Sequence, residues 1–298
     1  MTIFERITKI GKAKLISNAP SGSSEWHEQR ANSIGGSDVA SILGVSPYRS
    51  ALTLWAEKKN LLPATQATQA MLLGNFLESG IVEAYRANHP EYEVTSPGGT
   101  WESLNNSRFH ANPDGFIENE FGDTSVLEIK FTTQYWKELP KHYEAQVLWY
   151  MYITGLHNPA TVCAVTGGGY REFIVEYDRT LAEDTARAVE SFLELLDTNS
   201  EPEIDESEST LETVRQMSDY SEDEIDLDDY ETEIAALFSA SNMLKVWEQQ
   251  TRMRKSQIIK AMQGKRWGYV NGKQVVSLQK RGEGNPYLKL EDGTQWDS

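Results

Sequence analysis

The chain has 298 residues, of which 39% are hydrophobic and 24% charged, and its formal net charge is −17. That length accommodates one large domain or two ordinary ones. The single cysteine, Cys163, excludes a disulfide framework and a cysteine-ligated zinc or iron–sulfur site, and it fits a reducing cytoplasm. No apolar run reaches membrane-spanning length and no signal-peptide core opens the sequence, so we expect neither membrane association nor export.

The chain's negative charge is concentrated in one stretch. Residues 201–231 hold 14 acids and one base, whereas residues 245–281 hold ten Lys and Arg and one acid. The first stretch is poor in apolar residues, which is typical of a linker or disordered segment. The second is basic, so the net charge does not exclude DNA as a partner.

The elements predicted in chain order mix helices and strands. Residues 1–22 are polar and end in Ser and Gly, which predicts a loose arm. Ser37 is the expected cap of a short helix over 37–44. The segments that follow are amphipathic helices over 50–62 and 71–89, strands over 92–95, 115–118 and 125–131, a buried helix over 142–156, two strands within 160–177 and a helix over 178–198. We therefore expect an α+β fold with a small central mixed sheet flanked by helices.

The C-terminal part is predicted to be a long helix over 234–264 followed by a hairpin over 267–280 that turns at Asn271-Gly272. This hairpin mixes aromatic and basic residues, which fits either a hairpin that grips DNA or one that caps the helix. The domain assignment is an N-terminal arm (1–22), a core (23–199), an acidic linker (200–231) and a C-terminal helix with a basic hairpin (232–298).

The stretch PDGFIENEFGDTSVLEIK, residues 113–130, carries the strongest chemical signal. Glu128 and Lys130 are two apart on a predicted strand and share a face, while Leu127 and Ile129 face the core. Asp114 begins an earlier strand that can fold back as a hairpin and bring its carboxylate alongside. Two adjacent carboxylates need a proton or a cation between them, and Mg²⁺ suits oxygen ligands. An exposed hairpin with a surface ion pair is the ordinary alternative.

Two further polar residues lie on predicted helices. Glu78 lies four residues after Gly74 and on the same face, where the glycine permits close approach. Gln146 lies amid apolar residues, where it requires a hydrogen-bond partner. A solvated glutamate and a glutamine at a helix edge are equally open interpretations.

The stretch EWHEQRANSIGGSDVASILGVSPY places Arg30 before a Gly-Gly turn and the helix capped by Ser37. Free N–H groups, a hydroxyl and a guanidinium make a suitable phosphate pocket. An ordinary N-cap beside a surface arginine is the alternative.

The order of these motifs resembles that of the lambda-exonuclease and YqaJ-like viral recombinase family. The motifs are Trp-His and Arg, Ile-Gly-Gly-Ser-Asp, Gly…Glu, Pro-Asp-Gly, Leu-Glu-Ile-Lys and Gln-x-x-x-Tyr. That family belongs to the PD-(D/E)XK nucleases, and the resemblance covers roughly residues 24–178. It implies a restriction-endonuclease-like core and an enzyme that, with Mg²⁺ or substituting Mn²⁺, digests the 5′ strand of linear double-stranded DNA to leave a 3′ single-stranded tail.

The resemblance also implies roles for particular residues. Asp114, Glu128 and the backbone carbonyl of Ile129 would bind the metal, with Glu78 completing the site. Lys130 would assist the attacking water, with a pKa lowered by a neighbouring metal ion, and Gln146 would complete the catalytic set. Arg30, Ser37 and Asn112 would hold the 5′-phosphate of the degraded strand.

The same resemblance implies two partners, double-stranded DNA ends and a phage single-strand annealing protein. It also implies that copies of the chain form a ring-shaped trimer and that the protein acts in the cytoplasm of a bacterial host. Two alternatives stay open. One is another PD-(D/E)XK endonuclease or a repair nuclease, and the other is a non-catalytic protein that binds DNA ends.

Overall fold

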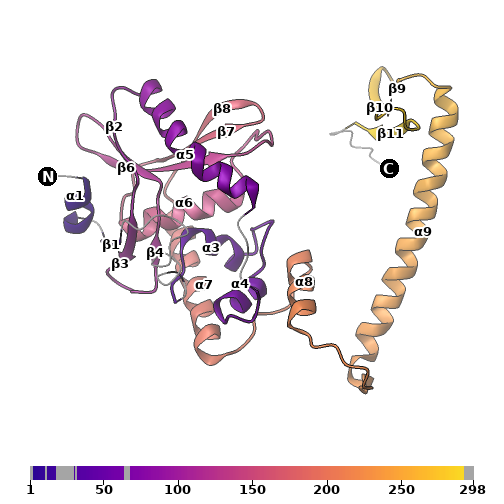
Figure 1. The fold of residues 1–298 in the computed structure, drawn as a ribbon, viewed down its shortest axis with the longest axis horizontal. Helices are drawn as coiled ribbons and strands as arrows, with labels where there is room; N and C mark the ends of the chain where they lie inside the picture. The colour runs from indigo at the N-terminus through magenta and orange to yellow at the C-terminus, as the bar shows by residue number, and fades with distance from the viewer. Residues whose placement is uncertain (1–2, 11, 18–29, 31, 64–67, 292–298) are drawn as a thin grey trace. The chain divides into compact units, whose positions relative to one another are not determined.

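The structure is a computed structural model that describes residues 3–10, 12–17, 30, 32–63 and 68–291 (Figure 1). The chain divides into two units, Met1–Tyr220 and Ser221–Ser298. None of the helices in the described ranges is long and apolar enough to cross a membrane.

A five-stranded mixed sheet forms the centre of the first unit. Its order is β2 (Glu93–Thr95), β5 (Gly115–Glu118), β6 (Thr124–Phe131), β7 (Ala160–Thr166) and β8 (Gly169–Val175). Strands β6 and β7 are parallel, whereas the other neighbours are antiparallel. The parallel pair is joined through helix α6 (Lys141–Thr154), because a parallel connection requires a crossover. This confirms the predicted α+β class with a mixed central sheet.

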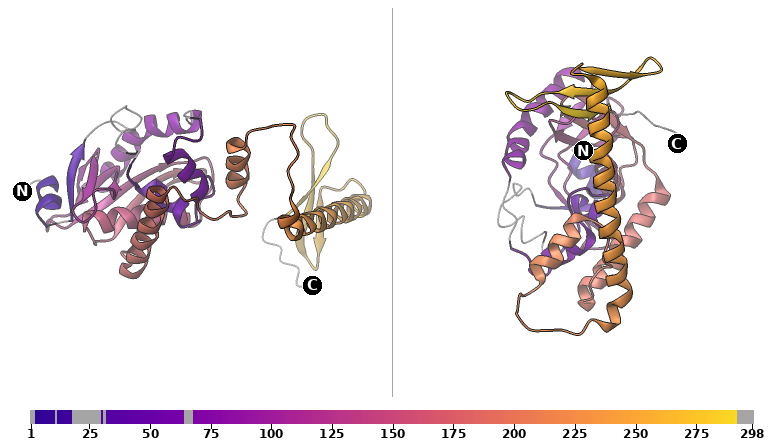
Figure 2. Two further views of the ribbon diagram at one scale, coloured as in Figure 1. Left: turned by 90° about the horizontal axis from the view of Figure 1, so that it is seen from below. Right: turned by 90° about the vertical axis from the view of Figure 1, so that its right-hand side faces the viewer.

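Helices cover both faces of this sheet (Figures 1 and 2). On one face, α5 (Gln69–Asn88) packs apolar side chains against Leu127 and Ile129. On the other, α6 and α7 (Arg179–Thr198) form the larger core, which includes Val126. Strand β6 is therefore buried on both faces. Any polar group on it needs a partner inside the protein.

Two shorter helices complete the core on the α6 side. Helix α3 (Gly36–Ile42) packs on α6 and α4 (Ala51–Lys58) packs on α3. The predicted cap at Ser37 is wrong: Gly35 is the N-cap, and Ser37 lies exposed in the first turn. The backbone N–H of Gly35 donates to Asp38 Oδ2 at 3.1 Å, so Asp38 ties down the start of the helix.

The N-terminal residues that the structure describes are ordered, which corrects the prediction of a loose arm. Helix α1 (Ile3–Ile10) buries Ile3 and Ile7, and strand β1 (Ala13–Ser17) pairs with β3 (Thr100–Ser103). Strand β3 also pairs with β4 (His110–Ala111) in a second, antiparallel sheet. This segment is held in place by strands that are distant in the sequence. Its own composition gives no indication of those partners.

The acidic stretch also contains structure that its composition did not predict. Helix α8 (Glu208–Met217) begins at Ser207, whose hydroxyl accepts from the N–H of Thr210, and it packs on α4. The N–H of Ser50 donates to Ser209 Oγ at 2.9 Å, and the hydroxyls of Thr53 and Thr213 share a hydrogen bond of 2.7 Å. The expectation of a linker is therefore wrong for this helix.

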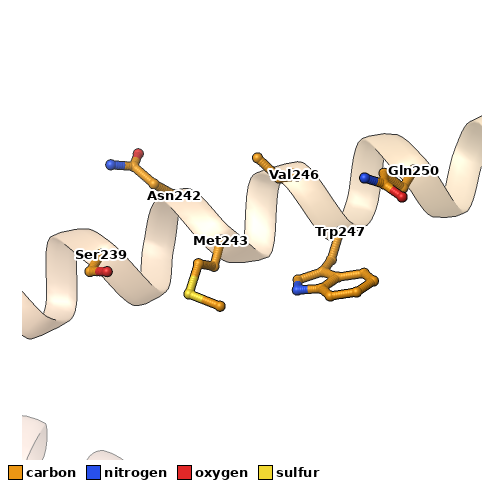
Figure 3. Close-up of a pocket in the computed structure, with 6 residues that line it drawn as sticks. All are labelled: Ser239, Asn242, Met243, Val246, Trp247 and Gln250. Atoms are coloured by element: carbon orange, nitrogen blue, oxygen red, sulfur yellow. The ribbon is translucent and has the colours of Figure 1, made fainter.

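The second unit begins with a one-turn 3-10 helix (Asp228–Tyr230) and α9 (Glu231–Met262). Strands β9 (Trp267–Val270), β10 (Lys273–Gln279) and β11 (Tyr287–Leu290) form an antiparallel sheet with β10 in the middle. Asn271 and Gly272 have φ of 49° and 78°, the left-handed turn that Asn-Gly predicts. Exposed side chains such as Met243 and Trp247 project from the middle of α9 (Figure 3).

Candidate active site

The predicted carboxylate pair forms where β5 begins opposite β6. The hairpin pairs Gly115 with Leu127, so Asp114 lies next to Glu128 along the ladder. Asp114 Oδ2 accepts a 2.7 Å hydrogen bond from the backbone N–H of Ile129. Glu128 is 1% exposed, so the alternative of a surface ion pair is wrong.

Three side chains surround the Glu128 carboxylate. Lys130 forms an ion pair with Oε1, and Gln146 Nε2 donates to the same oxygen at 2.7 Å. The Gln146 amide also lies 2.7 Å from the hydroxyl of Tyr150, one turn further along α6. Gln146 is therefore a buried, hydrogen-bonded contact of the site and not a packed helix edge.

The second Glu128 oxygen, Oε2, is buried and has no hydrogen-bond partner in the described part of the chain. Burial and the Asp114 carboxylate raise the pKa of Glu128 to about 8, although Lys130 opposes that rise. Burial also raises the pKa of Asp114, against the effect of Lys130. Burial thus raises the pKa of both carboxyls, and a bound cation would oppose both rises.

Glu78 comes from α5, which covers the face of the sheet opposite α6, and its carboxyl interacts electrostatically with Asp114 and Lys130. Burial first, and then repulsion from Asp114, raise the pKa of Glu78 to about 7, while Lys130 lowers it. The predicted role of Gly74 is not seen, because a Cβ added there would meet nothing within 4 Å. Glu78 thus lies near the pair without requiring a glycine beneath it.

Lys130 is held as an ammonium in this structure. Burial would lower its pKa, but the carboxylates of Glu128 and Asp114 outweigh that effect and raise it. Its Nζ also lies 5.1 Å from the centroid of the Tyr143 ring. In the metal-free chain the pKa of Lys130 is therefore raised, opposite to the direction expected beside a metal ion.

A cationic cluster forms around Asp38 at the start of α3. One Arg30 nitrogen, Nη2, donates to Ser37 Oγ at 2.9 Å and to Asp38 Oδ1 at 2.8 Å. The structure therefore brings together the predicted Arg30 and Ser37. The Trp-His of the preceding motif, at positions 26 and 27, lies outside the described residues.

Sequence reasoning missed the other members of this cluster. Arg49 Nη2 donates to Asp38 Oδ1 at 2.7 Å, and Lys58 Nζ lies 3.2 Å from Asp38 Oδ2. Burial would raise the pKa of Asp38, but the three cations, Arg30 foremost, hold it well below its usual range. The position of Asp38, three residues after Gly35, is a local pattern that indicates a capping acid at the start of a helix. Arg49 and Lys58 come from a different segment, and no local pattern indicates that they contact Asp38.

The cluster and the carboxylate pair adjoin each other across two consecutive glycines. A Cβ on Gly35 would lie 3.6 Å from Arg30 Nη1 and 3.7 Å from Asn112 Oδ1, so the predicted Asn112 borders the cluster. A Cβ on Gly36 would lie 2.4 Å from the Tyr150 ring and 3.0 Å from Gln146 Cγ. The α3 backbone therefore packs directly on the α6 residues that hold Glu128.

Residues 25–157 match the sequence model of the YqaJ-like viral recombinase domain. The chain is 26% identical over 185 residues to the uncharacterized protein YqaJ of Bacillus subtilis, covering 55% of this chain and 53% of that protein. It is 38% identical over 129 residues to protein D345L of African swine fever virus strain Badajoz 1971 Vero-adapted, covering 42% and 34%. The chain thus spans about half of the first relative and about a third of the second.

Among solved structures, the chain is similar to the alkaline exonuclease LHK-Exo of Laribacter hongkongensis in complex with dAMP. The TM-score is 0.49 at 21% identity, and the alignment covers 59% of this chain and 94% of that one. A phage-related exonuclease from Haemophilus somnus 129PT aligns with a TM-score of 0.44 at 12% identity, over 56% and 94%.

Proposed function

We propose that this chain is a Mg²⁺-dependent exonuclease acting on linear double-stranded DNA, because residues 25–157 match the sequence model of the YqaJ-like viral recombinase domain. It digests the 5′ strand and leaves a 3′ single-stranded tail. The observation that carries the proposal is the pair of a half-buried Asp114 and a buried Glu128, with Lys130 and Gln146 in contact with Glu128, next to a cationic cluster.

The donor set fits a hard divalent cation. Asp114, Glu128 Oε2 and the Ile129 carbonyl are oxygen ligands, and Oε2 is a buried acceptor with no partner in the described residues. The described part of the chain contains no group of three His, Cys, Asp or Glu side chains that could hold a metal by themselves. Water and substrate phosphate would complete the coordination of Mg²⁺, with Mn²⁺ as a substitute. When bound, such an ion neutralises charge on the phosphate and lowers the pKa of a bound water.

The protein's own groups orient the reaction. Gln146 and Lys130 both donate to Glu128 Oε1, and Oε2 has no hydrogen-bond partner among the described residues. The Lys130 ammonium donates hydrogen bonds and is suited to hold the attacking water and to offset charge that develops on the phosphate. With its pKa near neutrality, Glu78 would accept a proton from that water.

The cationic cluster supports the proposed strand polarity. Arg30, Arg49 and Lys58 all contact Asp38, and Arg49 also contacts Glu57, so three cations gather around one buried carboxylate. Ser37 is exposed in that cluster, and a guanidinium with a hydroxyl donor suits a terminal phosphate. Asn112 borders the cluster with its Oδ1, an acceptor, while its Nδ2 donates to Thr100 Oγ1 at 2.6 Å. Binding of a 5′-phosphate there would place the first phosphodiester of the same strand toward Glu128.

The test compares 5′-phosphorylated linear duplex, 5′-hydroxyl linear duplex and closed circular duplex, with Mg²⁺ and with EDTA. We expect Mg²⁺-dependent loss of the phosphorylated linear substrate, abolished by Asp114→Ala or Glu128→Ala and retained in the exposed control Glu120→Ala. Arg30→Ala should remove the preference for the phosphorylated end, and Arg30→Lys should restore it poorly, because lysine lacks the planar fork.

The outcomes separate the alternatives. Cleavage of the closed circle would indicate an endonuclease, and end binding with no cleavage in Mg²⁺ or Mn²⁺ would indicate a non-catalytic end-binding protein. Cleavage that persists in a folded Asp114→Ala chain would refute the site. We also propose that the chain assembles as a ring-shaped trimer, which a mass measurement by light scattering tests. We further propose that a single-strand annealing protein binds the single-stranded product.

A further inference from the structure

The two faces of the β9–β11 sheet differ in chemistry. One face carries Val276, Leu278 and Leu288, which cluster with Met262 at the end of α9. Gly268 lies on this face as well, where an added Cβ would sit 2.4 Å from Val276 Cγ2. Figure 2 shows the sheet lying across the end of the helix. This face caps α9, as one of the two sequence interpretations predicted.

The opposite face displays aromatic rings. Trp267 is paired with Ser277, Ser277 with Lys289, and Gln279 with Tyr287, so all these side chains share one face. Tyr269, two residues after Trp267, joins them. The exposed fractions are 45% for Trp267, 60% for Tyr269 and 38% for Tyr287. Because β10 separates β9 from β11, rings on these two strands stand about 10 Å apart across the sheet.

Guanidinium groups lie over two of these rings. Arg266 is 4.5 Å from the centroid of Trp267, and Arg281 is 5.7 Å from that of Tyr287. Residues 265–291 hold six Lys and Arg and two Glu, a net charge of +4. One of those acids, Glu291, lies on the face itself, because it follows Lys289 by two residues and its carboxylate accepts a hydrogen bond from Ser277. Cations fixed beside exposed rings match a ligand with flat apolar groups on an anionic backbone.

We propose that this outer face of the β9–β11 sheet binds single-stranded DNA. Unpaired bases stack on the exposed rings, and the neighbouring cations contact phosphates; the residues are Trp267, Tyr269, Tyr287, Arg266, Arg281 and Lys289. Duplex DNA offers no free base faces to such rings, so the surface favours a single strand. The choice of DNA over RNA rests on the proposed function, whose product is a single-stranded DNA tail.

The test uses the full chain in EDTA and fluorescence anisotropy with a labelled oligo(dT), a blunt duplex and an oligo(rU). Trp267→Ala with Tyr287→Ala should weaken oligo(dT) binding about tenfold to a hundredfold and leave duplex binding within twofold. Replacing the same two residues by Phe should restore the affinity, because Phe keeps the ring. Trp247→Ala, an exposed Trp on α9, is the matched control and should bind as the wild type does.

Unchanged oligo(dT) affinity in the alanine variant would overturn the proposal, and so would an equal loss for the single strand and the duplex. Tighter binding to oligo(rU) than to oligo(dT) would overturn the choice of DNA. Cross-linking of bromodeoxyuridine oligonucleotides to the wild-type chain should map to residues 265–291. Cleavage is measured separately in Mg²⁺, so a chain without nuclease activity and a chain without this binding surface give different results.

Discussion

Replacing Gly36 by alanine tests whether α3 and α6 are one rigid support for the site. The new Cβ would lie 2.4 Å from Tyr150 Cε1 and 2.9 Å from its Cζ, whereas ordinary carbon contacts are about 3.5–4.0 Å. The helix and the ring must therefore separate by about 1 Å. Overpacking of this kind costs about 1–3 kcal/mol of folding free energy.

Gly80→Ala is the matched control. Gly80 lies within α5, and a Cβ there would meet nothing within 4 Å. This substitution should stabilise the protein by about 0.5–1 kcal/mol, because alanine restricts the unfolded chain and favours a helix. The same glycine-to-alanine substitution should therefore lower the folding stability at Gly36 and raise it at Gly80.

Urea unfolding and the rate on a 5′-phosphorylated linear duplex give the two measurements. The 1 Å shift moves Ser37 and Asp38 relative to Gln146, so we expect the rate for Gly36→Ala to fall about a hundredfold, while Gly80→Ala keeps its rate. A Gly36→Ala chain as stable and as active as the wild type would show that α3 does not pack on Tyr150 as described.

Four further predictions concern charge and the end of the first unit. In EDTA, the raised pKa of Glu128 contributes stability that is complete below about pH 4.5 and is lost as pH rises through about 8. Urea unfolding should therefore show that the free energy of unfolding falls by roughly 2–3 kcal/mol between pH 6 and 8 in the wild type and not in Glu128→Gln. A wild-type free energy of unfolding that does not change over this range would contradict the prediction. Asp38→Asn leaves three cations without their carboxylate and should cost about 3–5 kcal/mol on unfolding, together with the 5′-phosphate preference; a cost below about 1 kcal/mol would refute the cluster. A chain ending at Asp205 should be about 2–3 kcal/mol less stable than one ending at Tyr220, because it lacks the α8 hydrogen bonds to α4, and equal stability would argue against that packing. Both truncated chains should bind duplex with a shallower salt dependence than the full chain, since the basic segment is gone.

The carboxylate site was predictable because its geometry is local. Alternation along β6 and a tight β5–β6 hairpin bring Asp114, Glu128 and Lys130 together within 17 residues. The order of the central strands and helices followed from periodicity for the same reason. Gln146 was recognisable from its apolar neighbours, since a buried amide must find a partner.

The cluster around Asp38 and the helix α8 were beyond local reasoning. Arg49 and Lys58 reach Asp38 only because α4 folds back on α3, and an isolated arginine or lysine carries no sign of such a partner. Helix α8 docks through hydroxyl groups such as those of Thr53 and Thr213, so its contact face leaves no apolar stripe in the sequence. Charge density alone then predicted disorder where tertiary contacts decide the structure.

The pairing of β1 with β3 sets an order of events during synthesis. Ala13 pairs with Ser103, so the N-terminal strand has no partner until about 90 further residues have been made. At roughly 5–20 residues per second, that interval lasts about 5–20 s. Throughout it the apolar side chains of α1, Ile3 and Ile7, have no β3 strand nearby to cover them. Strand β1 therefore stays unpaired until position 103 has been made, and slow translation before that position prolongs the exposure of these side chains.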